Sequence, residues 1–234
     1  MHVVAIPLED GSWEIRGHRV TFPVRIHDAA AACATYMVRA DRARAQLAGT
    51  GLEPVSVAGR TLLFLALIDY RVNDLGIYSE VATALPALHH GKIGLHILQL
   101  PVTEEFTLEA GRALWGLPKW LGRADLSISG RRGTCRLDEG AEHVLTAVIS
   151  ALPLRIPFTI PGAVTALAPR DGAVLASPVT ASVSGVRVGL GATVDLGARH
   201  PMAAQLRELG LPRRPLLTTV IDHVAFDMAP AVVR

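Results

Sequence analysis

Short apolar segments separated by turn residues recur along this chain. They are rich in Val, Ile, Thr and Tyr, the residues that favour strands. We predict ten strands, at 3–8, 20–26, 35–40, 61–70, 76–85, 93–102, 124–130, 143–150, 174–184 and 216–228. In the fifth strand the alternation of residues places Tyr78 and Glu80 on the same face.

Helical patterns are fewer and shorter than the strand patterns. One helix is predicted over 41–48, and a second begins at Pro201 and ends at Gly210. The strongest covers 104–115, where apolar residues recur at helical spacing and Thr103 is the predicted N-cap. Ten strands and three helices without regular βαβ alternation predict one α+β, mainly β domain over 1–234. We expect an antiparallel, barrel-like or cone-like sheet with a few short helices packed on it.

Composition narrows the classes of protein that fit. Half of the 234 residues are hydrophobic and 19% are charged, which excludes disorder as the dominant state. The net charge of +2 gives no argument for a nucleic-acid partner. The longest apolar run, Leu62–Ile68, is far shorter than the ~20 residues of a spanning helix, so we expect no membrane partner. The N-terminus lacks a secretory pattern, and Cys33 and Cys135 form no disulfide framework, which favours a cytoplasmic location.

Metal and nucleotide sites receive no support from the spacing of the candidate residues. The histidines of HHGKIGLH at 89–96 do not have the spacing of zinc ligands, and a polar loop explains them better. The glycines at 185–197 do not form a phosphate-binding pattern and are interpreted as turn or bulge residues. We therefore expect neither a metal nor an organic cofactor.

Lysine is rare in this sequence, which contains only Lys92 and Lys119 among 23 basic residues. Lys119 follows the predicted helix 104–115 on a loop, among Trp115, Leu117 and Trp120. A lysine among apolar side chains either extends its amine to water or is partly desolvated. A desolvated amine has a lowered pKa and is a nucleophile that forms a Schiff base with a carbonyl. The segment DYRVNDLGIYSE at 69–80 is also dense in polar groups, and by itself it reads as an ordinary hairpin.

Taken together, these two segments resemble the acetoacetate decarboxylase superfamily. The matching motifs are DYRVNDLGIYSE at 69–80 and EAGRALWGLPKWLG at 109–122, with TFPVRIHDA before them and, more loosely, HPMAAQLRELGLPRRPLLTT after them. The resemblance implies a β-rich barrel or cone, usually in homo-oligomers, that acts without a cofactor. It also implies that Lys119 forms the Schiff base and that Glu80 is the family's active-site acid. The family's N-terminal active-site arginine falls at Arg19, and a one-residue shift places it at His18 instead.

Two departures from the family pattern concern the charges near Lys119. Decarboxylases of this family typically carry a second lysine directly after the first, where this chain has Trp120. A further acid expected on the preceding strand falls at about Leu65. Without the second lysine, burial has to lower the pKa of Lys119, and we expect burial to prevail if the side chain is enclosed.

The leading hypothesis is a Schiff-base lyase that decarboxylates a small β-keto acid. In it, Lys119 and Glu80 are catalytic, and Arg19, Tyr78, Trp115 and Trp120 bind substrate. The alternative keeps the imine but performs aldol or dehydration chemistry on a pyruvate-like acid. A third hypothesis is a barrel that binds an apolar ligand without catalysis. The product separates the first two, and trapping of an imine separates both from the third.

Overall fold

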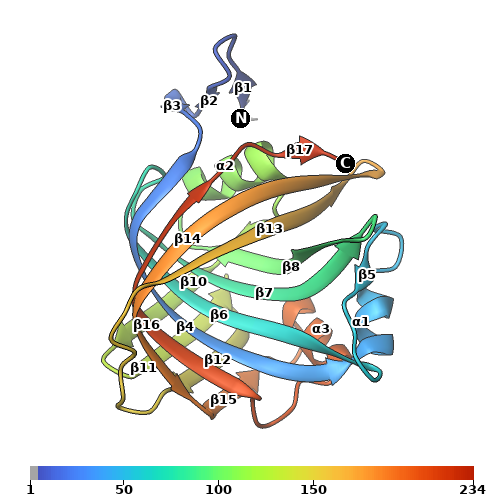
Figure 1. Cartoon of the computed structure of the whole chain (residues 1–234), viewed down its shortest axis with the longest axis vertical. Helices are drawn as coiled ribbons and strands as arrows, with labels where there is room; N and C mark the ends of the chain where they lie inside the picture. Colours follow the sequence, from blue (N-terminus) through green and yellow to red (C-terminus); the bar gives the residue numbers. More distant parts are fainter. Residues whose placement is uncertain (1–4) are drawn as a thin grey trace.

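A closed ring of seven strands forms the body of the molecule in the computed structural model, which describes residues 5–234 (Figure 1). The ring closes because β7 pairs with both β6 and β8. The predicted barrel is thereby confirmed, with strands that are longer than the sequence indicated. In order around the ring, its members are β7 (Tyr78–His89), β6 (Arg60–Asn73), β4 (Val24–Arg39), β16 (Leu217–Met228), β14 (Ala173–Gly189), β13 (Ile160–Arg170) and β8 (Lys92–Val102).

The barrel is mixed, and the prediction of a purely antiparallel sheet was wrong in this detail. Strand β8 pairs in parallel with β13 inside the ring, through Leu95 and His96. It also pairs in parallel with the short strand β9 (Lys119–Leu121). Lys119 is therefore the first residue of a strand, and its predicted position on a loop is wrong. A parallel pair joins segments distant in sequence, so local patterns do not reveal it.

A second sheet covers one side of the barrel. It consists of β10 (Arg123–Ser129), β11 (Arg132–Glu139), β12 (Glu142–Ser150) and β15 (Gly191–Leu196), in that order. The larger hydrophobic core lies between this sheet and the outward faces of β6 and β7. The smaller core lies inside the barrel and under α2 (Glu105–Trp115). The two faces of β6 and β7 therefore serve different purposes, one packing and one lining the barrel interior.

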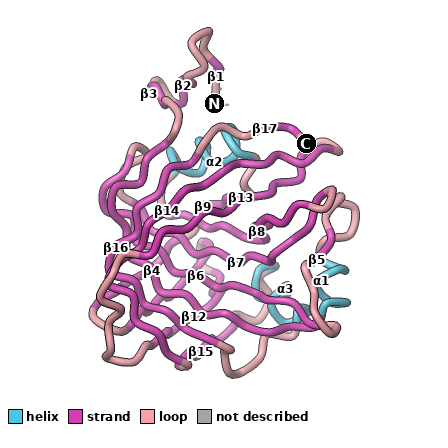
Figure 2. The backbone as a smooth tube through the Cα atoms, viewed as in Figure 1, coloured by secondary structure: helices cyan, strands magenta, loops and turns pink. Residues whose placement is uncertain are grey.

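Three helices and several short strands complete the fold (Figure 2). Helices α1 (Ala40–Gln46) and α3 (Pro201–Leu209) lie near each other, and α2 lies at the other end of the barrel. The small sheet of β1 (Ile6–Pro7), β2 (Trp13–Ile15) and β3 (His18–Val20) projects beside α2. The two-residue strands β5 (Glu53–Pro54) and β17 (Val232–Val233) pair with β7 and β14 of the barrel. Residues 3–4 of the predicted strand 3–8 lie outside the described residues. No helix within 5–234 is both long and apolar enough to cross a membrane.

Helix α2 ends where the sequence predicted but begins one residue later than expected. Its N-cap is Glu104 rather than Thr103, and no side chain caps it. Gly116 ends the helix with φ of 66°, a left-handed conformation that glycine adopts without steric cost. The chain then turns back through Leu117 into β9, which brings Lys119 under the helix it has just left.

Candidate active site

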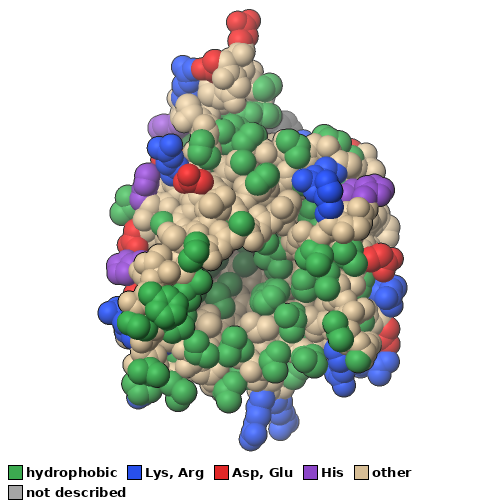
Figure 3. All heavy atoms as spheres, viewed as in Figure 1, with side chains coloured by type: hydrophobic (Ala, Val, Ile, Leu, Met, Phe, Trp, Pro, Cys, Tyr) green, Lys and Arg blue, Asp and Glu red, His purple; other side chains and the backbone are tan. Residues whose placement is uncertain are grey.

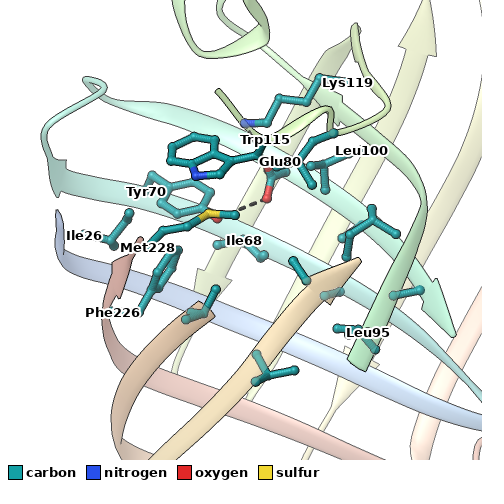
Figure 4. Close-up of a pocket in the computed structure, with 18 of the residues that line it drawn as sticks. Ile26, Ile68, Tyr70, Glu80, Leu95, Leu100, Trp115, Lys119, Phe226 and Met228 are labelled. Atoms are coloured by element: carbon teal, nitrogen blue, oxygen red, sulfur yellow. Dashed lines mark hydrogen bonds and ion pairs between the residues drawn. The ribbon is translucent and has the colours of Figure 1, made fainter. Parts of the chain in front are cut away.

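A cavity of about 310 Å³ occupies the barrel interior. All seven strands of the ring contribute to its wall, together with the end of α2 and the start of β9. Within the described part of the chain, four lining residues carry a hydroxyl, carboxylate or amine group, and apart from the indole N–H of Trp115 the rest of the wall is apolar (Figure 4). The four are Tyr70, Tyr78, Glu80 and Lys119.

Lys119 lies at the closed end of this cavity, with 4% of its surface exposed. Its Nζ is 3.0 Å from Oε2 of Glu80 and donates a hydrogen bond of 2.9 Å to Oγ1 of Thr107. The same nitrogen lies 5.1 Å from the centre of the Tyr78 ring, within the range of a cation–π contact. A buried ammonium group therefore has a carboxylate, a hydroxyl and an aromatic face around it.

The β6–β7 hairpin places the acid and the two phenols. Tyr78 and Glu80 are alternate residues of β7, so both point inward, as the sequence predicted. Tyr70 pairs with Tyr78 across the hairpin, and their rings stack with centres 4.3 Å apart. The Tyr70 hydroxyl donates a 3.0 Å hydrogen bond to Oε1 of Glu80. Each carboxylate oxygen of Glu80 thus has a partner, one from Tyr70 and one from Lys119.

The turn of this hairpin fixes the register that aligns these groups. The Asn73 side chain accepts a hydrogen bond from the backbone of Leu75 and donates one to the carbonyl of Gly76. Gly76 has φ of 89°, which its lack of a Cβ permits. The hairpin predicted from N-D-L-G is present, and it is also part of the site.

The electrostatics of Lys119 differ from the sequence expectation. Burial lowers the pKa of its amine and is the largest single influence, but the negative charge of Glu80 and the hydrogen bonding around Nζ act the other way. Their sum leaves the pKa of Lys119 raised above its ordinary 10.5. Enclosure therefore does not prevail here, because the amine is enclosed together with an acid. The resting site contains an ammonium–carboxylate pair.

The two phenols are neutral hydrogen-bond donors at ordinary pH. Burial raises the pKa of Tyr70 well above its usual value, and the nearby charge of Glu80 adds to the effect. Burial also raises the pKa of Tyr78, while the positive charge of Lys119 partly opposes it. Neither phenol is therefore an anion that competes with Glu80 as the partner of the Lys119 amine.

Helix α2 shapes the path of the Lys119 side chain. A Cβ built on Gly111 would lie 2.5 Å from Cδ and 2.6 Å from Cε of Lys119, closer than any real contact. Thr107 is one helical turn before Gly111, so the hydroxyl and the glycine surface are on the same side of α2. Nε of Arg112 donates a 2.7 Å hydrogen bond to the carbonyl of Lys119, and the lysine N–H donates to the carbonyl of Leu117 at 2.8 Å. The helix therefore holds both the backbone and the amine of the lysine.

With this geometry in place, comparisons with known proteins become informative. The family profile described as acetoacetate decarboxylase matches residues 6–157, which include both the β6–β7 hairpin and Lys119. This chain belongs to the acetoacetate decarboxylase family. Comparison with curated protein sequences finds no match. Membership supports an acetoacetate decarboxylase-like enzyme and leaves its reaction open.

Solved structures share the fold of this acetoacetate decarboxylase family member. Acetoacetate decarboxylase from Legionella pneumophila subsp. pneumophila str. Philadelphia 1 is 16% identical, with a TM-score of 0.71 over 91% of this chain and 87% of that one. The enduracididine biosynthesis enzyme MppR, in complex with pyruvate, is 16% identical with a TM-score of 0.69, over 100% and 98% of the two chains. An acetoacetate decarboxylase-like enzyme from Sphingomonas wittichii RW1 is 17% identical with a TM-score of 0.58, over 92% and 94%. At these identities the similarity concerns the fold.

Of the residues predicted from the family motifs, the structure brings four together. Lys119, Glu80, Tyr78 and Trp115 all line the cavity. The Trp115 indole N–H donates to the carbonyl of Ala229 at 2.9 Å, which fixes its ring in the wall.

Trp120 does not line the cavity, contrary to the expectation. It follows Lys119 on a strand, so its side chain points to the opposite face. There it packs against the core between the two sheets, its indole N–H donates to Oε1 of Gln99 at 3.0 Å, and its ring lies 5.0 Å from that of His200. Leu65 also faces that core, because its neighbours Phe64 and Ala66 are the ones that face the cavity. Neither departure from the family pattern therefore alters the cavity wall.

Arg19 also lies outside the cavity, on β3 of the projecting sheet. Its side chain is 59% exposed, forms an ion pair with Asp10 and donates to the Ser12 hydroxyl at 3.0 Å. His18, the alternative position, packs edge-on against Phe106 of α2. Arg19 therefore does not line the barrel cavity of this chain, because strand β3 belongs to a separate sheet, and its carboxylate-binding role stays a prediction.

Sequence reasoning missed three residues that contact or shape the Lys119–Glu80 pair, namely Tyr70, Thr107 and Gly111. Tyr70 had a signal, because a hairpin centred on Asn73–Gly76 pairs it with Tyr78. Thr107 and Gly111 had only their helical spacing, which does not reveal what packs on that face.

Proposed function

We propose that this protein is a Schiff-base-forming lyase that decarboxylates a β-keto acid through an imine on Lys119. The observation that carries the proposal is the buried Lys119–Glu80 pair at the closed end of an apolar cavity. Its members are 3.0 Å apart, which is within the reach of direct proton transfer. No metal or organic cofactor has a part in the chemistry that follows.

Imine formation begins with transfer of a proton from the ammonium group of Lys119 to Glu80. The transfer converts two charges into a neutral amine and a neutral acid, and an apolar ligand that expels water from the cavity favours the neutral pair. The free amine attacks the ketone carbon, and a proton moves from nitrogen to the former carbonyl oxygen. Glu80 then returns its proton to this hydroxyl group, which leaves as water. The product is a protonated imine on Lys119 beside an ionised Glu80.

Loss of carbon dioxide follows from the electron demand of the protonated imine. The carbon–carbon bond to the carboxylate breaks, its electron pair enters the imine system, and a neutral enamine remains. The reaction removes a negative charge from an apolar enclosure formed in part by Trp115 and Leu117, and such an enclosure disfavours the charged reactant. A proton from solvent converts the enamine back to a protonated imine. Water then adds with Glu80 as base, and the ketone leaves the regenerated ammonium group.

The polarity of the wall favours decarboxylation over aldol chemistry on pyruvate-like acids. A pyruvate imine has to retain its carboxylate throughout the reaction, and a retained buried carboxylate needs a cationic partner. Among the described residues that line the cavity, Lys119 is the one cation, and its positive charge is lost when the protonated imine becomes the neutral enamine. A β-keto acid loses its carboxylate instead.

Borohydride trapping tests the proposal. The protein is incubated with acetoacetate and borohydride, its intact mass is measured, and the modified peptide is mapped. We expect a stable adduct on Lys119, its loss in Lys119→Ala, its retention in Lys92→Ala, and release of carbon dioxide. Lys92 is the matched control because it is the other lysine and is exposed at the end of a hairpin. An adduct with pyruvate and no carbon dioxide from any β-keto acid would replace decarboxylation by aldol-type chemistry. No adduct with any keto acid would leave a barrel that only binds ligands.

A further inference from the structure

The cavity extends well beyond the Lys119–Glu80 pair. Leu100, which pairs with Lys119, and Leu95, which pairs with Ala166, both line it. They are five residues apart on β8, and at ~3.3 Å per residue this corresponds to roughly 16 Å. Figure 4 shows Leu95 at the far end of the cavity from Lys119. A small keto acid bound at Lys119 would fill only the closed end.

Small side chains create the space beyond the pair. Ala82 and Ala84 follow Glu80 on the inward face of β7, and Ala66 lies directly opposite Ala82 on β6. Ala166 faces them from β13. At ~30 Å³ for each water-sized group, a cavity of 310 Å³ holds about ten non-hydrogen atoms, more than acetoacetate contains. Methyl groups line this part, so its occupant is apolar.

The lining residues of the cavity differ in exposure. Lys119, Glu80, Ala84 and Ala166 are buried, Ala82 and Ala66 are half-buried, and Val164 is 43% exposed. The cavity therefore meets solvent near Val164. The space-filling view shows a hollow in the middle of one face, with hydrophobic side chains around it (Figure 3). A ligand with its carbonyl at Lys119 would extend an apolar tail from the closed end towards this mouth.

We infer that the preferred substrate is a 3-oxo acid with an apolar tail, about six or seven carbons in all, because three of the roughly ten non-hydrogen atoms that fit are oxygens. The inference rests on the proposed imine chemistry and adds the part of the substrate that does not react. Each methylene group buried along the alanine-lined wall adds binding, and an increment of about 0.8 kcal/mol per methylene corresponds to roughly fourfold in kcat/KM. The gain stops where the chain reaches solvent at the mouth.

The test is a chain-length series of 3-oxo acids from four to fourteen carbons. We expect kcat/KM for carbon dioxide release to rise about fifteenfold for every two carbons at first, and then to level off or fall. Borohydride trapping on Lys119 is measured with each member of the series. An adduct at every length with a flat or falling kcat/KM from four carbons onward would overturn the tail inference alone. Absence of an adduct at every length would overturn the proposed function.

Two variants of β13 locate the tail. Ala166→Leu fills the far part of the cavity and is expected to move the preferred chain length down by several carbons. Ala163→Leu makes the same substitution at an exposed position on the opposite face of this strand, and we expect it to keep the original profile. Should Ala166→Leu fail to fold, Ala82→Val narrows the same space from β7. An equal shift of the length profile in Ala166→Leu and Ala163→Leu would contradict a tail in this part of the barrel. An unchanged profile in Ala166→Leu and Ala82→Val would contradict it as well.

Discussion

Replacing Glu80 by Gln removes the negative charge beside the Lys119 amine while keeping the size of the side chain. At the observed separation of 3.0 Å and an effective dielectric constant of about 20, the lost attraction is about 5 kcal/mol. A neutral hydrogen bond from Gln recovers about 1 kcal/mol of it. Burial, which lowers the pKa of Lys119, then acts against the weaker remaining influence of Tyr78 alone. The pKa of the amine should fall from above its ordinary value to below it.

Competitive acetylation measures this change directly. Acetic anhydride is small and uncharged, and it reacts with the free amine, so its rate at Lys119 follows the deprotonated fraction. A loss of about 4 kcal/mol predicts a rate at neutral pH that is on the order of 10²–10³ times greater in Glu80→Gln. Lys92 in the same digest supplies the internal reference. Glu53→Gln, at an exposed glutamate paired with Arg44, is the matched control and should change neither lysine.

Turnover should change in the opposite direction. Gln cannot accept or return a proton, so kcat in Glu80→Gln should fall by about 10²–10⁴-fold although more amine is free. The combination of faster acetylation and slower catalysis separates the two roles assigned to Glu80. If Lys119 in Glu80→Gln is acetylated no faster than in the unmodified protein, Glu80 does not keep the amine protonated and the electrostatic reasoning is wrong.

Three further outcomes follow from the contacts of the site and the core. Gly111→Ala should displace the side chain of Lys119 and lower the yield of trapped imine at least tenfold, although Ala by itself stabilises a helix. The control Gly162→Ala, where a Cβ meets nothing within 4 Å, should leave the yield unchanged. Tyr70→Phe removes a hydrogen bond to a carboxylate worth about 1.5–3 kcal/mol, and kcat/KM should fall by tenfold or more while circular dichroism stays the same. Burial raises the pKa of Cys33 to about 11 and that of Cys135 to about 12, so both thiols stay protonated at pH 8. Iodoacetamide should therefore modify them only after unfolding, and rapid modification of the folded protein would contradict this burial.

Local patterns were sufficient for the hairpin that carries the acid. The turn residues Asn73 and Gly76 and the alternation through Tyr78 and Glu80 are all within one short segment, and the structure has them as predicted. The helix end at Gly116 is local in the same sense. Among the longer strands, β11, β13 and β15 were missed, because glycine, proline and charged residues interrupt their apolar patterns, and the short strands β2, β5, β9 and β17 were missed as well.

The orientation of Trp120 and the pKa of Lys119 depend on contacts between distant parts of the chain, which local sequence patterns do not predict. The direction of Trp120 depends on three residues of β9 pairing with Leu100–Val102, and nothing near Trp120 in the sequence indicates that partner. The pKa of Lys119 depends on opposing effects, burial against the nearby Glu80 and Tyr78, so its direction follows from their placement around the amine and not from residue types. Family motifs identified both members of the pair, and the structure was needed to know that they form an ion pair at rest.

The hydrogen bond from Arg112 to the carbonyl of Lys119 has a consequence for the entropy of the reaction. Helix α2 holds the backbone carbonyl of Lys119 through Arg112 and its amine through the Thr107 hydroxyl. If the helix moves, the amine therefore moves together with that hydroxyl. Immobilising a free lysine side chain costs up to ~2 kcal/mol in lost rotamer freedom. In this fold that freedom is lost when the chain folds, long before a carbonyl compound arrives. The activation entropy of imine formation is then set by the ordering of the incoming molecule and not by that of the enzyme.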